Sequence, residues 1–493
     1  MYEDYRPAGY STWTQRVLAR LGDDRPALIE TTSDGAEEWT GAEFRRMVSG
    51  AVDLLDREGV TEGTMVPALL ATRPASVALL LAGALSGRPL APLAPRLTEA
   101  ELVTVVADLP GEVLVAEPGS VTVARAVAAA TGKRVVLLDG PLHGTRELTP
   151  RDDPDGVALV MHTSGTTGRP KRVLVRDFAM GRRADVVGYL LDLHPGDRLV
   201  TTSLFHHMGA LGNIGVALGN GAALVTFPAF SVDAWRELGS AGPTHAVTIP
   251  SVFEMLLAAG ALESRTMRVL GYGASPIHPD TMKQIQESMP GVAFVNLFGQ
   301  TEGSPVSALL PEDHRAAAAG RKELLRSVGR AAPGTELRID EPDADGVGEV
   351  WARCPHSFSV DAEGWQHTGD LGRIAEDGYV YLVGRRGDKI IRGGENVYPL
   401  EVEQVLTAHP GVRHAVVVPV PDRRLGETIG AYLVPADPAN PPGFEELRAF
   451  ARVRLAGFKV PVLWRMVDDL PRNPSGKVLR RTLIARAEAA FTT

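Results

Sequence analysis

Four apolar runs of this chain are each followed by glycine and polar residues. The runs begin near residues 157, 197, 268 and 292, and each is short and rich in Val, Leu or Phe. Such runs predict β-strands, and the longer amphipathic segments between them predict helices. Strands that alternate with helices form layered α/β domains, whose ligands bind where the strands end. We therefore expect an α/β fold with a ligand site built from the residues that follow these strands.

The sequence changes character beyond residue 329. Short strands with tight turns replace the alternation of strands and helices, which predicts a small β element. Segment 385–394 is charged and rich in glycine, as expected for a linker. We predict two domains: a large N-terminal layered α/β domain with the small β element over residues 1–386, and a smaller, mobile C-terminal α+β domain over residues 387–493.

Composition argues against several classes of protein. The 493 residues carry a formal net charge of −9 without a block of like charge, which argues against a nucleic-acid partner. Cys354 is the one cysteine, so an intramolecular disulfide is impossible. The acidic N-terminus lacks the features of a signal peptide, and the most apolar segment, 75–87, is too short to cross a bilayer. We expect a cytoplasmic protein without a membrane span, in which 75–87 is a buried helix.

Segment 161–173 is typical of a phosphate-binding loop. Glycine lets backbone N–H groups approach phosphate oxygens, and hydroxyl groups and a lysine add further donors. Pro170 disfavours a helix through this segment, so we expect a loop between two strands rather than a nucleotide-binding loop that opens a helix. Alone, the composition also fits an ordinary Gly/Ser/Thr turn. The residues expected at the phosphates are Thr163, Ser164, Gly165, Thr166, Thr167, Gly168 and Lys171.

Two adjacent histidines, His206 and His207, follow the predicted strand at 197–203. At the end of a strand they could line or gate a pocket. A histidine in such a position is also often a structural residue with satisfied hydrogen bonds, and this alternative stays open for His207.

Six segments, in this order along the chain, resemble the adenylate-forming superfamily and in particular its acyl-CoA synthetase and ligase branch. The segments are 163–171, 298–302, 368–370, 384–385, 393–399 and 474–480, and 87–98 is similar to the family as well. The resemblance implies a two-step reaction. A carboxylate attacks the α-phosphorus of ATP and releases pyrophosphate, and a thiol then displaces AMP from the acyl-adenylate. A small-molecule carboxylic acid is the implied substrate, with ATP, Mg²⁺ and coenzyme A as cofactors.

The same resemblance implies roles for individual residues. Thr301 matches the residue that contacts the α-phosphate, and Glu302 matches the Mg²⁺ ligand. Lys477 matches the lysine that binds the carboxylate and the α-phosphate, where charge gathers during adenylation. His206 joins these three as a catalytic candidate. The residues implied to hold the rest of ATP or AMP are Gly273, Ala274, Ser275 and Asn296 at the base, Phe298 stacked on adenine, Gly299, Gln300, and Asp370 and Arg385 near the ribose.

The resemblance also implies that the small domain swings between the two half-reactions. The hinge falls at Gly387, and the swing removes Lys477 and brings Gly393, Gly394, Glu395 and Asn396 toward the thiol. Two residues depart from the family pattern. Gly387 replaces the usual Asp or Lys, and Arg172 replaces the glycine that usually follows the loop lysine. These departures leave open an enzyme specialised for thioester formation on a preformed acyl-adenylate. The alternative that is not an enzyme is a protein that binds or senses an acyl-adenylate.

Residues 205–214 bear on which acid the chain would activate. Phe205 is followed by His206, where family members that activate amino acids carry an aspartate for the ammonium group. We therefore expect an acid without an α-amino group. Glycines near the predicted pocket, with Met208, Leu211 and Ile214, favour a bulky hydrophobic acid, although the glycines could instead serve backbone packing. The residues assigned to the acyl pocket are His206, His207, Gly209, Gly212, Tyr272 and Gly273.

The segment 394–399 is typical of ligases that use coenzyme A as the acceptor. We expect no carrier domain after residue 481, and a carrier protein would then be a separate molecule. A separate carrier protein, or a partner adenylating enzyme that supplies the acyl-adenylate, is the alternative partner.

Overall fold

The computed structural model describes residues 2, 4–7, 9, 12–32, 35–164, 170–263, 266–275, 277–472 and 478–491, with the backbone alone at 163–164, 170 and 488–491. The chain packs into two compact units. The first comprises Met1–Leu324, Ala331–Glu336 and Arg353–Gln366, and the second comprises Leu325–Arg330, Leu337–Ala352 and His367–Thr493. We describe each unit by itself.

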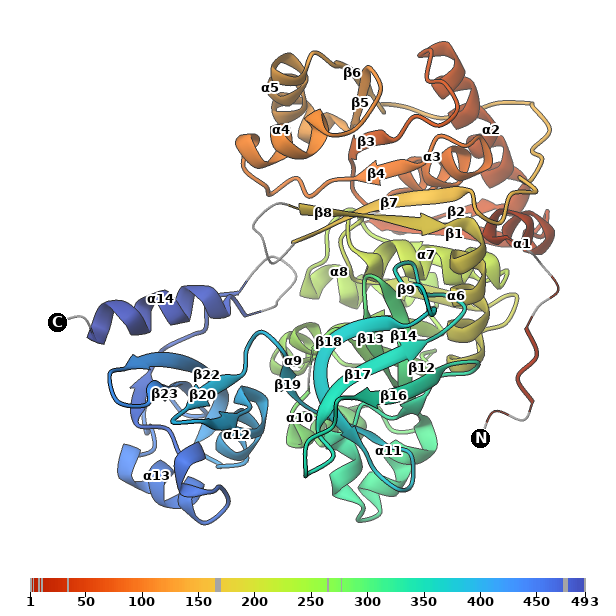
Figure 1. The fold of residues 1–493 in the computed structure, drawn as a ribbon. Helices are drawn as coiled ribbons and strands as arrows, with labels where there is room; N and C mark the ends of the chain where they lie inside the picture. Colours follow the sequence, from red (N-terminus) through yellow and green to blue (C-terminus); the bar gives the residue numbers. More distant parts are fainter. Residues whose placement is uncertain are drawn as a thin grey trace. The chain divides into compact units, whose positions relative to one another are not determined.

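The first unit contains two mixed sheets with helices on their faces (Figure 1). One sheet has the order β15-β14-β13-β12-β11-β9-β10-β1-β2, and the other has the order β6-β5-β3-β4-β7-β8. The strands of the first sheet are β1 (Pro26–Thr32), β2 (Gly35–Thr40), β9 (Arg198–Thr201), β10 (Ala223–Thr226), β11 (His245–Thr248), β12 (Val269–Gly273), β13 (Ala293–Gln300), β14 (Gly303–Leu309) and β15 (Arg330–Ala331). The second sheet is built from β3 (Val66–Leu69), β4 (Leu90–Pro92), β5 (Val113–Ala116), β6 (Arg134–Leu137), β7 (Val157–Ser164) and β8 (Pro170–Arg176).

Two helices of this unit begin at recognisable local signals in the sequence. Thr40 forms a capping box with Glu43 at the start of α2, and Pro74 occupies the first turn of α3, where its missing N–H costs nothing. Every residue of α3 except the partly buried Ala75 is buried, in line with the buried helix predicted for 75–87. The helices are α1 (Trp13–Arg20), α2 (Gly41–Arg57), α3 (Pro74–Leu85), α4 (Glu99–Ala107), α5 (Val121–Thr131), α6 (Asp177–Leu190), α7 (Met208–Gly219), α8 (Val232–Glu237), α9 (Pro250–Ala258), α10 (Pro279–Ser288) and α11 (Pro311–Ala318).

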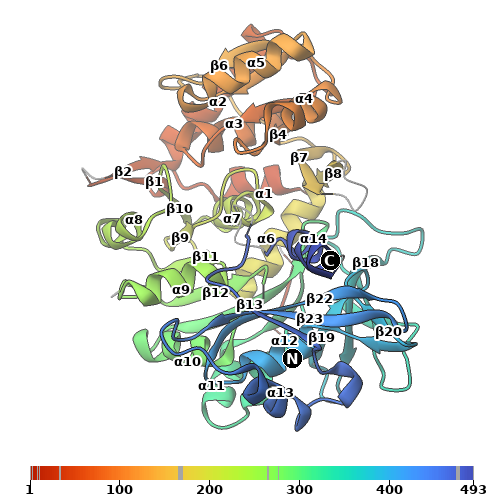
Figure 2. The ribbon, with the colours of Figure 1, turned by 90° about the vertical axis from the view of Figure 1, so that its left-hand side faces the viewer.

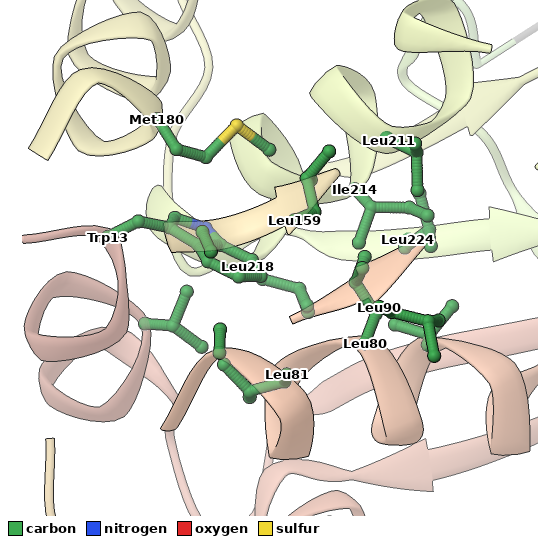
Figure 3. Packing of buried hydrophobic residues seen from close by; sticks show 14 of the residues in the cluster. Trp13, Leu80, Leu81, Leu90, Leu159, Met180, Leu211, Ile214, Leu218 and Leu224 are labelled. Carbon is green, nitrogen blue, oxygen red and sulfur yellow. The ribbon is translucent and has the colours of Figure 1, made fainter. Parts of the chain in front are cut away.

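One hydrophobic cluster joins the two sheets (Figure 3). Leu90 on β4 and Leu159 on β7 come from one sheet, and Leu224 on β10 comes from the other. Helices α1, α3, α6 and α7 fill the space between them with Trp13, Leu80, Met180 and Ile214, among others. Burial of each side chain of this size stabilises the folded protein by about 1.5–3 kcal/mol. The packing of these side chains therefore holds α6 and α7 in place against the sheets.

Helix α7 begins soon after β9 and is rich in glycine, and residues 208–219 are helical. Glycine is a poor helix former, but here the glycines let α7 pack closely against α6 and α1, and tertiary packing outweighs local propensity.

The second unit contains the small sheet β16-β17-β18-β19 and a sheet of order β21-β20-β23-β22 with β24 paired to β23 (Figures 1 and 2). This confirms an α/β protein with a large N-terminal part and a smaller α+β part. The boundary at 386/387 stays a prediction. The elements are β16 (Glu336–Asp340), β17 (Gly348–Arg353), β18 (Gln366–Ile374), β19 (Val380–Arg385), β20 (Ile390–Arg392), β21 (Glu395–Val397), α12 (Pro399–Thr407), β22 (Val412–Asp422), β23 (Gly426–Pro435), α13 (Phe444–Arg452), β24 (Leu463–Met466) and α14 (Arg480–Phe491).

Within the described ranges, the structure has no helix that is both long enough and apolar enough to span a bilayer.

Candidate functional site

Strands β7 and β8 form an antiparallel hairpin that carries the predicted phosphate loop. Thr163 pairs with Lys171, and Ser164 pairs with Pro170, so the hairpin extends to both ends of segment 165–169. The two flanking strands are thereby confirmed. Gly165, Thr166, Thr167 and Gly168 lie outside the described residues, and phosphate binding stays a prediction for this loop. Lys171 is exposed at the base of the loop.

Arg172 has a partner in the N-terminal sheet region. Its Nη1 donates to the carbonyl of Asp108 at 3.3 Å and lies 3.9 Å from the sulfur of Met65. Asp108 is the C-terminal cap of α4, where carbonyl groups lack helical partners and a cation is favourable. Across the hairpin, Arg172 faces His162, whose pKa is lowered by burial and by this positive charge. Arg172 therefore anchors β8 to α4.

The ends of β12 and β13 bring together the residues predicted to hold the adenine base. The two strands are parallel neighbours, and Tyr272 pairs with Asn296 and Gly273 with Leu297. A Cβ on Gly273 would collide with the carbonyl oxygen of Leu297, so this position requires glycine. Ala274 follows with φ of 68°, a left-handed conformation that residues with a Cβ rarely adopt. Such backbone strain gathers at functional sites, which supports the predicted role of 273–275.

Strand β13 ends in the turn that carries Thr301 and Glu302. Asn296 and Phe298 lie two residues apart on one face of β13, and both are partly exposed. A Cβ on Gly299 would come within 2.8 Å of the Gly303 carbonyl oxygen, so the strand turns back tightly here. The carbonyl of Glu302 accepts a hydrogen bond of 2.6 Å from the Phe358 N–H, which holds the backbone of the turn.

Glu302 fits the role of a Mg²⁺ ligand. In the described part of the chain, no three His, Cys, Asp or Glu residues cluster closely enough to form a protein-only metal cage. Mg²⁺ bound with a nucleotide usually takes one or two carboxylates and completes its shell with phosphate oxygens and water. A single half-buried carboxylate at the end of a strand is the donor set that this arrangement needs.

Tyr272 belongs to the core rather than to an open pocket. It is 1% exposed, and its hydroxyl lies 2.9 Å from His314 Nε2 and also bonds Asn296. Burial raises the pKa of this phenol and keeps it protonated. The structure thus gives no support to Tyr272 as an acyl-pocket residue, because β12 turns this side chain toward α11.

His206 and His207 lie where β9 leads into α7. Their ring centroids are 4.2 Å apart, and His207 precedes the first turn of the helix. Burial, the neighbouring His207 and the positive charge of Arg96 lower the pKa of His206 to about 3. Burial also lowers the pKa of His207, whose Nε2 is buried without a hydrogen-bond partner. Both rings are therefore uncharged at neutral pH.

Neighbouring side chains occupy the space beside the glycines of α7. A Cβ on Gly212 would lie 2.5 Å from Cζ of Arg183, one on Gly215 would collide with Met180, and one on Gly209 would lie 2.5 Å from Oγ of Ser203. The expectation that these glycines leave room for a bulky acid is not supported, and the alternative of backbone packing explains them.

The apolar neighbours of these glycines are core residues. Met208 is 8% exposed, and Leu211 and Ile214 are completely buried in the cluster of Figure 3. The expectation that Leu211 and Ile214 line a pocket is wrong, because the helical period of α7 turns them into the core.

Arg183 was missed at the level of the sequence. It lies on α6 three residues after Met180 and four before Val187, and both neighbours are buried. Residues three and four positions apart share one face of a helix, so this spacing puts Arg183 on the buried face of α6. The spacing could have identified Arg183 as a buried arginine from the sequence.

Asp370 and Arg385 in the second unit meet across the β18–β19 ladder. They are register partners, and Arg385 Nε donates to Asp370 Oδ1 at 2.9 Å. The Asp370 side chain is 10% exposed and that of Arg385 is 48% exposed. The structure thus brings together the two residues that the resemblance places at the ribose. For Arg385, a structural ion pair with Asp370 is the alternative to nucleotide binding.

Gly387 lies in an exposed turn between two anchored residues. Arg386 bonds Glu349 at 2.8 Å, and Asp388 lies 3.5 Å from Arg480. A Cβ on Gly387 would meet nothing within 4 Å, and its φ is not left-handed, so a Cβ fits there without strain. The hinge role stays a prediction.

Gly393 and Gly394 form the two-residue turn between β20 and β21. Their φ angles are 60° and 91°, as in the hairpin turn that glycine pairs favour, and Glu395 and Asn396 are exposed beside it. Lys477 lies outside the described residues. Arg472 and Val478, which are described, pair in an antiparallel β-bridge.

Comparisons with known proteins agree with this fold and these motifs. A family model of AMP-binding enzymes matches residues 14–360, and the model of their C-terminal domain matches residues 401–477. The chain therefore belongs to the AMP-binding enzymes, that is, to the adenylate-forming superfamily. This class comprises AMP-forming acid–thiol ligases, and ATP, Mg²⁺ and coenzyme A are its cofactors.

Individual relatives cover nearly the whole chain. A feruloyl-CoA synthase from Amycolatopsis sp is 32% identical over 96% of this chain and 98% of its own length. The fatty acid–[acyl-carrier-protein] ligase ScoC from Streptomyces coeruleorubidus is 33% identical over 82% of this chain and 83% of its own. Among solved structures, the amide bond synthetase McbA from Marinactinospora thermotolerans is 30% identical, with a TM-score of 0.85 over 96% of this chain and 99% of its own.

Proposed function

We propose that this enzyme is an acyl-CoA ligase that activates a carboxylic acid without an α-amino group and transfers the acyl group to coenzyme A. The observation that carries the proposal is that half-buried His206 follows Phe205 just before α7, at the position where family members that activate amino acids carry an aspartate. An α-ammonium group needs a negative partner when it leaves water, and neither His206 nor His207 supplies one. The proposal therefore specifies that the acid lacks an α-amino group and does not specify the size of the acid.

Residues in the motifs that match the family would act in the first half-reaction. Lys171 and the hydroxyl groups of the β7–β8 loop would hold the outer phosphates, and Thr301 would bond the α-phosphate, where charge develops. Mg²⁺ bound at Glu302 would neutralise phosphate charge. Phe298 would stack on the base, and Asp370 would accept hydrogen bonds from the ribose hydroxyls. Lys477 would bind the attacking carboxylate and the α-phosphate together.

Lys477→Ala provides the test of these assignments. Pyrophosphate release with the best acid should fall by at least 10²-fold, a loss typical of one removed group at a developing charge. Thioester formation from a supplied acyl-adenylate should stay within a few-fold of the parent enzyme. Equal loss of both half-reactions would contradict the role of Lys477. Pyrophosphate exchange by the parent enzyme alone would exclude the alternative of an enzyme confined to thioester formation, and any turnover would exclude the sensor.

The acceptor is tested separately. The similarity to ScoC supports a separate carrier protein as the second candidate, and the similarity to McbA makes an amine worth including. AMP release should be compared with coenzyme A, with a phosphopantetheinylated carrier protein and with a primary amine as the acceptor. We expect coenzyme A to give the fastest release, and a preference of tenfold or more for either other acceptor would overturn this part of the proposal.

A further inference from the structure

Arg183 is a buried arginine without a counter-charge. Its side chain lies on α6 and the residue is 5% exposed, while Nε and Nη1 are buried with no hydrogen-bond partner. Across the described residues, Arg183 forms no ion pair and no side-chain hydrogen bond. Burial lowers the pKa of Arg183 to about 10, so the guanidinium stays charged at neutral pH. A buried charge without a partner is strongly unfavourable, and proteins rarely keep one without a use.

Other buried arginines of the same unit are paired. Arg16, 4% exposed, bonds Asp185, the carbonyl of Gly219 and Oδ1 of Asn220. Arg88, 9% exposed, lies 2.6 Å from Asp56. The fold thus supplies acidic partners where an arginine is structural, and the missing partner at Arg183 is specific to that position.

The guanidinium of Arg183 lies against α7, next to the proposed acyl site. Its Cζ would be 2.5 Å from a Cβ on Gly212, so the missing side chain of Gly212 is what gives the guanidinium its room. Gly212 lies five residues along α7 from His207, which is about 7.5 Å at the rise of an α-helix. Arg183 is therefore within the length of a small acid from the two histidines.

His356 is the titratable neighbour of Arg183, and it offers no negative charge. It is fully buried, and burial together with the charge of Arg183 lowers its pKa to about 4. Its Nε2 donates to the carbonyl of Pro305 at 2.7 Å, so Nδ1 of the neutral ring is an acceptor, and it has no partner. An unpaired cation and an unpaired ring nitrogen therefore lie close together in the interior of the first unit.

We propose that Arg183 binds a second carboxylate of the acid substrate, at the end remote from the carboxylate that is adenylated. The proposal rests on the proposed function, because it assumes that the acid lies beside His206 and His207. A guanidinium binds a carboxylate through two parallel hydrogen bonds, which gives the pair both strength and orientation. Binding of a dicarboxylic acid would supply the charge that the protein itself does not, and an acid that lacks the second carboxylate would leave the cation unpaired.

The test compares diacids with their half-esters. Affinities of succinate, glutarate, adipate and terephthalate, and of the monomethyl ester of each, are measured by calorimetry without ATP. We expect at least one diacid to bind the wild-type protein more than tenfold more tightly than its half-ester. Arg183→Met should reduce this ratio below twofold. Arg182→Met, one residue away on α6 but partly exposed, is the matched control and should keep the ratio.

Thermal unfolding without ligand separates this role from a structural one. Arg183→Met removes an unpaired buried charge and keeps the side-chain volume, so the melting temperature should stay equal or rise. A fall of several degrees, or a diacid preference that survives in Arg183→Met, would overturn the proposal, as would the absence of any preference across the four pairs. If no acid releases pyrophosphate, the proposed ligase function fails, and the affinity ratio still decides the role of Arg183.

Discussion

At the level of single residues, Gly273 and Ala274 differ in what their positions require. Position 273 has no room for a Cβ, whereas Ala274 carries a Cβ in a backbone conformation that favours glycine. Ala274→Gly should stabilise the protein by up to about 1 kcal/mol, because glycine adopts the left-handed conformation without a Cβ clash but loses more chain entropy on folding. Gly273→Ala should destabilise it by about 1–3 kcal/mol, because the new methyl group meets the Leu297 carbonyl. Urea unfolding measures both. A destabilised Ala274→Gly variant would show that the left-handed conformation is not strained.

His206 leads to a prediction about the pH dependence of activity. Its pKa near 3 means that the His206 ring gains no proton between about pH 6 and 9, and burial lowers the pKa of His207 below its ordinary value as well. The pH profile of kcat/KM for pyrophosphate release should therefore lack an acidic limb near the ordinary histidine pKa of about 6.5. An acidic limb near pH 6.5 that disappears in His206→Asn would contradict the uncharged state assigned to this residue.

At the level of elements, Arg172 is expected to stabilise the β7–β8 hairpin rather than to bind pyrophosphate. Its hydrogen bond at the end of α4 is exposed, so Arg172→Gly should cost only about 0.5–1.5 kcal/mol of stability. Pyrophosphate exchange should stay within about threefold of the parent enzyme, whereas Lys171→Ala, the matched variant one residue away, should lower it at least 10²-fold. A large gain in exchange in Arg172→Gly would show instead that this arginine crowds the phosphate loop.

The turn at Gly387 allows a test of the hinge. Because a side chain there would meet nothing, Gly387→Ala should leave folding and both half-reactions nearly unchanged. Gly387→Pro restricts the backbone of Arg386 as well as its own, so it should favour one position of the C-terminal domain and slow one half-reaction by tenfold or more. Separate measurements of pyrophosphate release and of thioester formation distinguish the two steps. Equal slowing of both would mean that the pivot lies elsewhere.

Local patterns predicted the elements well and the contacts between them poorly. The β7–β8 hairpin and the buried helix at 75–87 depend on residues close in the sequence, and the structure confirms them. Helix α7 was missed because its glycines disfavour a helix in isolation, and only packing against α6 explains them. The same packing decides that Leu211 and Ile214 belong to the core. Arg183 was missed because its lack of a counter-charge is a property of residues brought together from distant segments.

At the level of the whole molecule, buried histidines should make the protein sensitive to acid. Burial lowers the pKa values of His314 and His356 to about 4, and both are at most 1% exposed. Each histidine takes up a proton in the unfolded chain near pH 6.5 but not in the folded protein. Their stability contribution is therefore complete above about pH 6.5 and is lost as the pH falls toward 4, by about 2 kcal/mol for each histidine at pH 5.

Asp177 opposes this trend but should not cancel it. Burial raises its pKa to about 6, so the folded protein holds this proton more tightly than the unfolded chain, and the contribution of Asp177 grows as the pH falls through 6. Burial also raises the pKa of Glu30, so two carboxyl groups act against the two buried histidines. His206, whose pKa is lowered to about 3, acts in the same direction as the histidines. The melting temperature should therefore decrease between pH 6.5 and 4.5. The double variant His314→Asn, His356→Asn should start lower, because it loses the bonds to Tyr272 and Pro305, but should show a shallower decrease. A slope equal to that of the parent protein would mean that other groups control its acid stability.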